Sequence, residues 1–221
     1  MKIITLDDIK NNNLIRCYMG KANEHLGVIG FTEHGERHIN QVSLKASLIL
    51  QELGFSSRDV ELAAIAGYLH DIGNVINRDA HGISGALLIA PILHQMGMEP
   101  EELANILGAI GNHDEHHYQV INHISAALIL ADKTDVHRSR VRNQDFATFD
   151  IHDRVNYAAV DGGLDIDKEE RTITLELTID IDICPVMEYF EIFLLRMVMC
   201  RRAAEFLECR FALIINGSKL L

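Results

Sequence analysis

Residues 67–73 read Gly-Tyr-Leu-His-Asp-Ile-Gly and set an imidazole next to a carboxylate at the end of an apolar stretch. We expect a helix from Ser56 to about Asp71, which Gly73 ends. Neighbouring residues do not share a helical face, but at a helix end the side chains of His70 and Asp71 can converge on one ion. Imidazole nitrogen together with carboxylate oxygen suits Fe, Mn, Zn, Co or Ni. A solvent-exposed helix end would show the same pair. The rest of the chain therefore decides between a metal site and an exposed helix end.

The sequence around this motif has a helical hydrophobic pattern from about Glu33 to Val141. Thr32 is placed to cap the first helix, and Pro91 predicts a kink or a break in the third. Besides the helix that ends near Asp71, we expect helices over residues 33–53, 83–96, 100–111 and 124–135. Together these elements predict a mainly helical domain over residues 1–145.

The period of the pattern changes after about Asp150. From Thr172 to Ile183, isoleucine and leucine alternate with threonine, glutamate and aspartate, which is typical of a strand with one buried face. Three further elements are expected, namely a strand at 164–167 that pairs through the charged turn 168–171, a long amphipathic helix from Pro185 and a closing strand at 211–215. The chain is therefore expected to be mainly α, with a small α+β (β-β-α-β) subdomain over residues 150–221.

The charge of the chain limits its partners. Its 221 residues include 20 Lys and Arg against 32 Asp and Glu, a formal net charge of −12. We expect no general nucleic-acid binding, because phosphate backbones attract the opposite charge. No membrane partner is expected either, since the longest apolar run is too short to cross a bilayer and Met1–Lys10 has no secretory signal. Four cysteines without a Cys-x-x-Cys pair indicate reduced thiols and a cytoplasmic protein.

Histidine is concentrated in the helical part. Of 12 histidines, nine fall between His34 and His123, and histidine is the commonest metal ligand. His38 lies on the first expected helix, and Asp132 interrupts a run of Ala, Leu and Ile at residues 126–131 on the last of these helices. A carboxylate in such a buried run costs free energy unless it meets a cation. His38 and Asp132 therefore join His70 and Asp71 as candidate ligands.

In order and context, His38, His70-Asp71 and Asp132 resemble the signature of the HD superfamily of metal-dependent phosphohydrolases. The resemblance covers about residues 34–142 and implies an HD-type helical bundle in which these side chains bind a metal. The implied cofactor is a divalent metal, typically of the transition series, drawn from Fe, Mn, Co, Ni, Zn or Mg. As a whole, the chain is similar to uncharacterised bacterial HD-domain proteins.

Two further histidines resemble ligands of the binuclear branches of this superfamily. His81 opens the third expected helix and His113 follows the fourth. The resemblance implies that Asp71 bridges two metals per chain, with His81 and His113 on the second. Alternatively, both histidines contact the metal ligands or the substrate and do not bind a metal themselves. Residues 131–138 are similar to the dinucleoside-tetraphosphate hydrolases, but His81 follows Asp71 by only ten residues, which leaves the substrate open.

A basic cluster directly follows the last of these helices. Lys133, Arg138 and Arg140 are candidate phosphate-binding residues, and the resemblance implies that an arginine after Asp132 faces the phosphates. Cations at the C-terminus of a solvated helix are the alternative interpretation. His34, four residues before His38, is expected to line the site.

The resemblance implies a metal-dependent phosphohydrolase in which a metal-bound hydroxide cleaves a phosphoester or phosphoanhydride. Its substrate would be a nucleotide or another small phosphorylated metabolite. Asp71, Asp114 and His34 are the candidate catalytic residues, with Asp114 as a general acid or base. One alternative is an HD-type di-iron oxygenase, which uses the same ligands to activate O₂. Another is a nucleotide-sensing binding module with a dimerisation tail. The apolar faces of the C-terminal strand and helix need a cover, so either the strand pair covers its own helix or two copies pair their strand edges. Of these two, a homodimer is the expected assembly.

Overall fold

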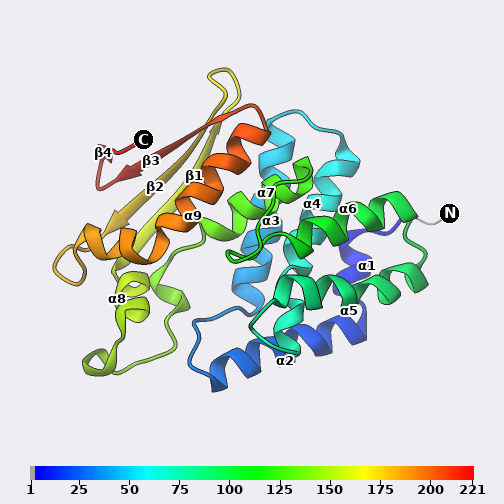
Figure 1. Ribbon diagram of the computed structural model, residues 1–221, viewed down its shortest axis with the longest axis horizontal. Coiled ribbons are helices and arrows are strands. Elements are labelled where there is room, and N and C mark those ends of the chain that lie inside the picture. The colour runs from blue at the N-terminus through cyan, green and yellow to red at the C-terminus, as the bar shows by residue number, and fades with distance from the viewer. Residues whose placement is uncertain (1–2) are drawn as a thin grey trace.

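The computed structural model describes residues 3–221 and shows a bundle of helices beside a small sheet (Figure 1). The bundle consists of α1 (Leu6–Lys10), α2 (Asn13–Val28), α3 (Glu36–Glu52), α4 (Ser57–Leu69), the 3-10 helix η1 (Ile72–Val75), α5 (His81–Met96), α6 (Pro100–Gly111) and α7 (His123–Lys133). The turns η2 (Arg138–Arg140) and η3 (Phe146–Thr148) lead to α8 (Ile151–Ala158). The expected fold class, a helical bundle with a small α+β part, is confirmed. Among the described residues, no helix is both long and apolar enough to cross a membrane.

Polar capping residues set the beginning of the bundle helices. The Ser56 side chain accepts a hydrogen bond from the backbone N–H of Asp59 at the start of α4, and Asn122 forms a capping box that begins α7. The prediction for α3 is wrong, because this helix begins at Glu36 instead of following Thr32. The backbone N–H of Glu33 donates to the carbonyl of Arg140, which holds the preceding segment as a loop.

Helix α5 runs through Pro91 as one element, so the predicted break is wrong. Proline removes the hydrogen bond to the carbonyl four residues earlier, which here belongs to Leu87. Both residues are on the exposed side of α5, and Leu87 is 72% exposed. Water can therefore bind the carbonyl that Pro91 leaves without a partner.

The sheet has the strand order β1-β2-β3-β4, where β1 is Ala159–Asp167, β2 Thr172–Ile179, β3 Arg210–Ile215 and β4 Ser218–Lys219. The first two strands form the expected antiparallel hairpin, with Leu164 opposite Leu175. The alternation in β2 buries every second residue, as predicted, although the strand ends at Ile179 and not at Ile183. Strand β3 pairs parallel to β2, because α9 (Val186–Phe206) connects the two as a crossover.

Helix α9 joins the sheet to the bundle. It crosses in front of the sheet in Figure 1 and packs against both β3 and α7. Tyr189 and Phe193 on α9 are fully buried, and one hydrophobic core extends from Ile4 to Ile215. The apolar face of β2 is therefore covered within the chain, whereas Leu194 on α9 remains 56% exposed. The division into domains at residues 145–150 stays a prediction.

Candidate metal centre

Six side chains meet where five helices of the bundle begin or end. Residues that can hold a metal ion fall into three overlapping groups, which are His38, His70 and Asp71; His70, His113 and Asp132; and Asp71, His81 and His113. His38 lies in the first turn of α3, His70 caps the C-terminus of α4 and His81 begins α5. Five of the six are at most 3% exposed, and Asp132 keeps 12% of its side chain exposed. All six predicted ligands are thus together in one buried cluster.

A glycine lets the two halves of this cluster approach each other. Gly73 in η1 passes so close to α5 that a Cβ there would lie 1.9 Å from the carbonyl oxygen of His81. This close approach brings His81 within reach of Asp71. Nε2 of His81 lies 3.3 Å from Oδ1 of Asp71. A side chain at position 73 would push these elements apart.

Hydrogen bonds fix which ring nitrogen of each clustered histidine faces the centre. In every case Nδ1 donates to an acceptor outside the cluster, so the neutral ring carries its lone pair on Nε2. His38 donates to the carboxylate of Asp135 at 2.7 Å. The other three histidines donate to backbone carbonyls: His70 to Gly67 at 2.8 Å, His81 to Arg78 at 3.0 Å, and His113 to Ile110 at 2.7 Å. Hydrogen bonding of this kind is typical of metal-ligating histidines.

The inward-facing atoms fit a cation. The Nε2 atoms of His38 and His70 are 3.3 Å apart, and those of His81 and His113 are 3.1 Å apart. Lone pairs at these distances repel unless a positive charge lies between them. Among the described residues, buried Oδ2 of Asp71 has no hydrogen-bond partner, although a buried carboxylate oxygen needs one. A divalent metal would satisfy all of these atoms.

Asp71 lies between the two pairs of histidines. Its Oδ2 is 3.3 Å from Nε2 of His70, whereas its Oδ1 is 3.3 Å from Nε2 of His81. The side-chain amide of Asn74 donates to the same Oδ1 at 2.9 Å and fixes the carboxylate plane. Each oxygen of Asp71 thus faces a different pair, which is the placement that a bridging ligand needs.

The cluster holds its carboxylates ionised. Burial by itself raises the pKa of Asp71, but the nearby imidazoles, His70 foremost, bring it well below its usual range. The pKa of Asp132 is also lowered against burial, chiefly by Lys133, whose Nζ lies 2.7 Å from Oδ2. Burial lowers the pKa of His70, yet Asp71 and Asp132 outweigh this and raise it to about 10, so without a metal Nε2 of His70 carries a proton, which a bound cation would replace. The two carboxylates therefore attract positive charge to this place.

Sequence reasoning missed one residue behind the cluster. Asp135 accepts from Nδ1 of His38 at 2.7 Å and from Nη2 of Arg37 at 2.7 Å, while Arg140 also lies beside it. Burial raises the pKa of Asp135, but His38 and Arg140 bring it far below its usual range. The available signal was its position three residues after Asp132, within a basic segment.

Comparison with known proteins identifies the segment that carries the cluster. Residues 35–137 match the HD domain family. This segment is an HD domain. HD domains form a superfamily of metal-dependent phosphohydrolases and bind divalent metals, so the resemblance drawn from the motif is confirmed. The binuclear branch stays a prediction.

One relative is an uncharacterised protein of Methanocaldococcus jannaschii. It is 28% identical over 159 residues, which are 62% of this chain and 61% of the relative. The chain thus spans less than two thirds of the length of that relative.

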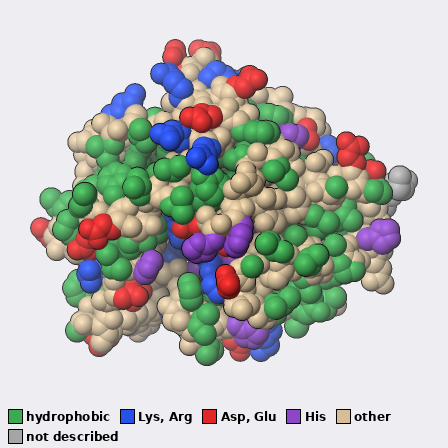
Figure 2. Space-filling view, in the orientation of Figure 1, with side chains coloured by type: hydrophobic (Ala, Val, Ile, Leu, Met, Phe, Trp, Pro, Cys, Tyr) green, Lys and Arg blue, Asp and Glu red, His purple; other side chains and the backbone are tan. Residues whose placement is uncertain are grey.

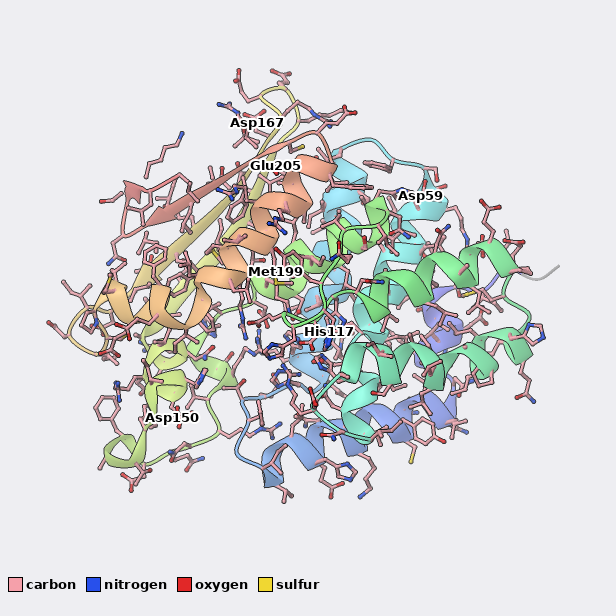
Figure 3. The ribbon with its side chains drawn as sticks, viewed as in Figure 1. Asp59, His117, Asp150, Asp167, Met199 and Glu205 are labelled. Carbon is pink, nitrogen blue, oxygen red and sulfur yellow. The ribbon has the colours of Figure 1, made fainter. Side chains whose placement is uncertain are left out.

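A cavity of about 280 Å³ adjoins the HD domain cluster. Figure 2 shows histidine, basic and acidic side chains gathered beside a hollow in the middle of this face. Figure 3 shows side-chain nitrogens gathered near His117 in the centre, with Asp150 on the α8 side. Two predicted site residues, His34 and Arg140, line the cavity. Nδ1 of His34 donates to the carbonyl of Thr32, and its ring packs edge-on against His38 with centroids 5.3 Å apart.

The other predicted residues lie around the cavity without lining it. Lys133 is buried and paired with Asp132, and Arg138 packs over the ring of Tyr157 at 5.1 Å. Asp114 is buried 4.0 Å from Nδ1 of His81 and belongs to none of the candidate ligand groups. Roles in substrate binding or catalysis stay predictions for all three.

Two arginines beside the HD domain cluster were also missed. Arg78 places Nη1 3.7 Å from Oδ1 of Asp71, and Arg196 extends from α9 into the same cavity. Nothing in the local sequence marks either residue, because each reaches the site only through the packing of η1, α5 and α9.

Proposed function

We propose that this protein is a metal-dependent phosphohydrolase that acts on a small phosphorylated molecule. The observation that carries the proposal is a single one: four histidines direct their Nε2 lone pairs at two ionised carboxylates, next to a cavity lined by arginines. The donor set suits divalent transition metals, and guanidinium groups suit phosphoryl oxygens.

The ligands divide into two sets. His38, His70 and Asp132, with Oδ2 of Asp71, would hold one ion, while His81 and His113, with Oδ1 of Asp71, would hold another. When bound, such metals make water a nucleophile near neutral pH and stabilise charge on phosphoryl oxygens.

The residues around the ions supply binding and proton transfer. Arg78 and Arg140 would hold the phosphoryl group at the side of the cavity nearest Asp71. Burial, together with the charge of Arg140, lowers the pKa of His34 well below its usual range, so this imidazole is neutral and can accept a proton on Nε2. Asp114, in the loop after α6, would donate or accept a proton. Lys133 would keep Asp132 ionised.

The first experiment is to count the metals in freshly purified protein by plasma mass spectrometry and to assay phosphate release. Substrates would include p-nitrophenyl phosphate, nucleotides and sugar phosphates, with chelated protein as the control. We expect close to two metals per chain and phosphate release that chelation abolishes.

Two results would overturn the proposal. No metal after reconstitution would leave the nucleotide-binding module as the function. A pair of irons, with O₂ consumption and no phosphate release from any substrate, would make the protein an oxygenase.

A further inference from the structure

The cavity beside the metal centre is built almost entirely outside the HD domain. Of its thirteen lining residues, only Arg78 lies within residues 35–137. The loop between α2 and α3 forms one wall, with Phe31 and His34, and helices α8 and α9 form the opposite wall. The segment that selects a ligand is therefore not the segment that would hold the metals.

Three guanidinium groups meet in this cavity, and a partner holds each of them along one edge. Nε of Arg196 donates to Oε1 of Glu115 at 2.7 Å, and its guanidinium stacks on Phe193 at 4.3 Å. Nε and Nη1 of Arg140 donate to the carbonyls of Glu33 and Asp135. Nη1 of Arg78 donates to Asn74. The positions of all three groups are thus fixed by the fold.

The remaining edges of these arginines are free. In residues 3–221, no hydrogen bond uses either Nη of Arg196, Nη2 of Arg140, or Nε and Nη2 of Arg78. Guanidinium groups that are oriented but half-used form a ready site for phosphate or carboxylate oxygens, because charged hydrogen bonds need no further ordering of the side chain.

Position and charge indicate which part of a ligand binds here. Arg78 reaches the metal cluster through Asp71, whereas Arg196 approaches from α9 on the other wall. One phosphoryl group engaged by the metals and Arg78 would leave the two Nη groups of Arg196 without an acceptor. The wall at α8 carries Asp150 and Asp153, which repel anions but accept hydrogen bonds from hydroxyl groups.

We propose that this cavity, through Arg196, binds a second anionic group of the substrate, distinct from the phosphoryl group that is cleaved. The substrate class is then a small hydroxylated organic phosphate that carries a further phosphate or carboxylate. A volume of about 280 Å³ is at the lower end for small-molecule sites and favours a small ligand. This inference rests on the proposed phosphohydrolase function.

The test compares two ligands that differ only in the second anion. Propane-1,3-diphosphonate and propylphosphonate both contain P–C bonds that phosphatases do not cleave, and titration calorimetry on the metal-loaded protein measures their binding. We expect the diphosphonate to bind at least about tenfold more tightly, in line with one charged hydrogen-bonded pair. Arg196→Gln should remove this preference and leave propylphosphonate binding and the metal content unchanged.

Two variants control for indirect effects. Arg201→Gln alters an exposed arginine of the same helix, which pairs with Glu205, and should keep the preference. Glu115→Gln removes the partner of Arg196 but keeps the guanidinium, and should also keep it. The inference is overturned if the wild-type protein shows no preference, if Arg196→Gln weakens both ligands equally, or if Glu115→Gln alone reproduces the loss.

The outcome separates this inference from the proposed function. Phosphate release without a preference for the diphosphonate would leave a phosphohydrolase whose second anion site is absent. A preference that depends on Arg196 without any phosphate release would retain the anion site and refute the hydrolase.

Discussion

The metal cluster and the arginine cavity lie side by side but are built differently. The cluster lies on helix ends of the HD domain and is almost completely buried, and each of its histidines is oriented by a hydrogen bond that Nδ1 donates. The cavity is lined by loops and by α8 and α9, and its arginines keep unused donors. The first region is complete within the bundle, whereas the second depends on how the rest of the chain packs on it. Under the proposed function, the first region would carry out the reaction and the second would select the substrate.

The largest effect is expected from Asp71→Ala. This change removes the carboxylate whose two oxygens face the two histidine pairs, so metal binding and hydrolysis should both be lost. Metal content and phosphate release measure the two effects. Asp79→Ala, at an exposed position of the same segment, is the matched control and should change neither. Full activity in Asp71→Ala would refute the assignment of this cluster as the reaction centre.

Gly73→Ala should damage the cluster through the backbone. The new methyl group would overlap the carbonyl oxygen of His81, and relief of such overpacking costs on the order of 1–3 kcal/mol or more of unfolding free energy. Because His81 must move, the metal content should also fall. Urea unfolding measures the stability.

Gly20→Ala in α2 is the control, since a Cβ there meets nothing within 4 Å and alanine favours the helix. A Gly73→Ala protein with unchanged stability and metal content would show that the contact between η1 and α5 does not position His81.

Asp135→Asn tests whether the cluster depends on the residue behind His38. The amide cannot replace the ionised acceptor of the His38 Nδ1 proton, so metal affinity should fall roughly ten- to hundredfold. Competition with a chromogenic chelator measures it. Arg37→Gln keeps the carboxylate on His38 and should have a smaller effect. Equal losses in both variants would mean that the ion pair, and not the orientation of His38, matters.

The smallest change is expected when the metals are removed from the intact protein. Cys17 is exposed, whereas burial raises the pKa of Cys184 to about 11 and of Cys200, on α9, to about 12. A thiol reagent should therefore modify one cysteine rapidly. The number should stay at one after the metals are chelated, because apolar packing holds α9 in place. Rapid reaction of further thiols only in chelated protein would show that the cluster and the cavity wall are coupled.

Most of the bundle followed from patterns that act over a few residues. Capping residues and apolar periodicity located α4, α6 and α7 to within about two residues, and the alternation from Thr172 located β2. The start of α3 was misplaced because the backbone of Glu33 bonds to Arg140, over a hundred residues away. Helix α8 was not predicted, since its short apolar side is covered only through tertiary contacts.

From the sequence alone, local patterns gave most helices of the HD domain in order, and the resemblance to the HD superfamily pointed to the six side chains of the cluster. Only the tertiary structure decided that Asp135 orients His38 and that Arg78 and Arg196 face one cavity. Asp135 and His38 are separated by 97 positions in the sequence. Arg78 and Arg196 come from different elements of the fold. Spacing along a chain contains no information about such contacts, which arise only when the helices pack and bring charged groups together in a shared, poorly hydrated interior.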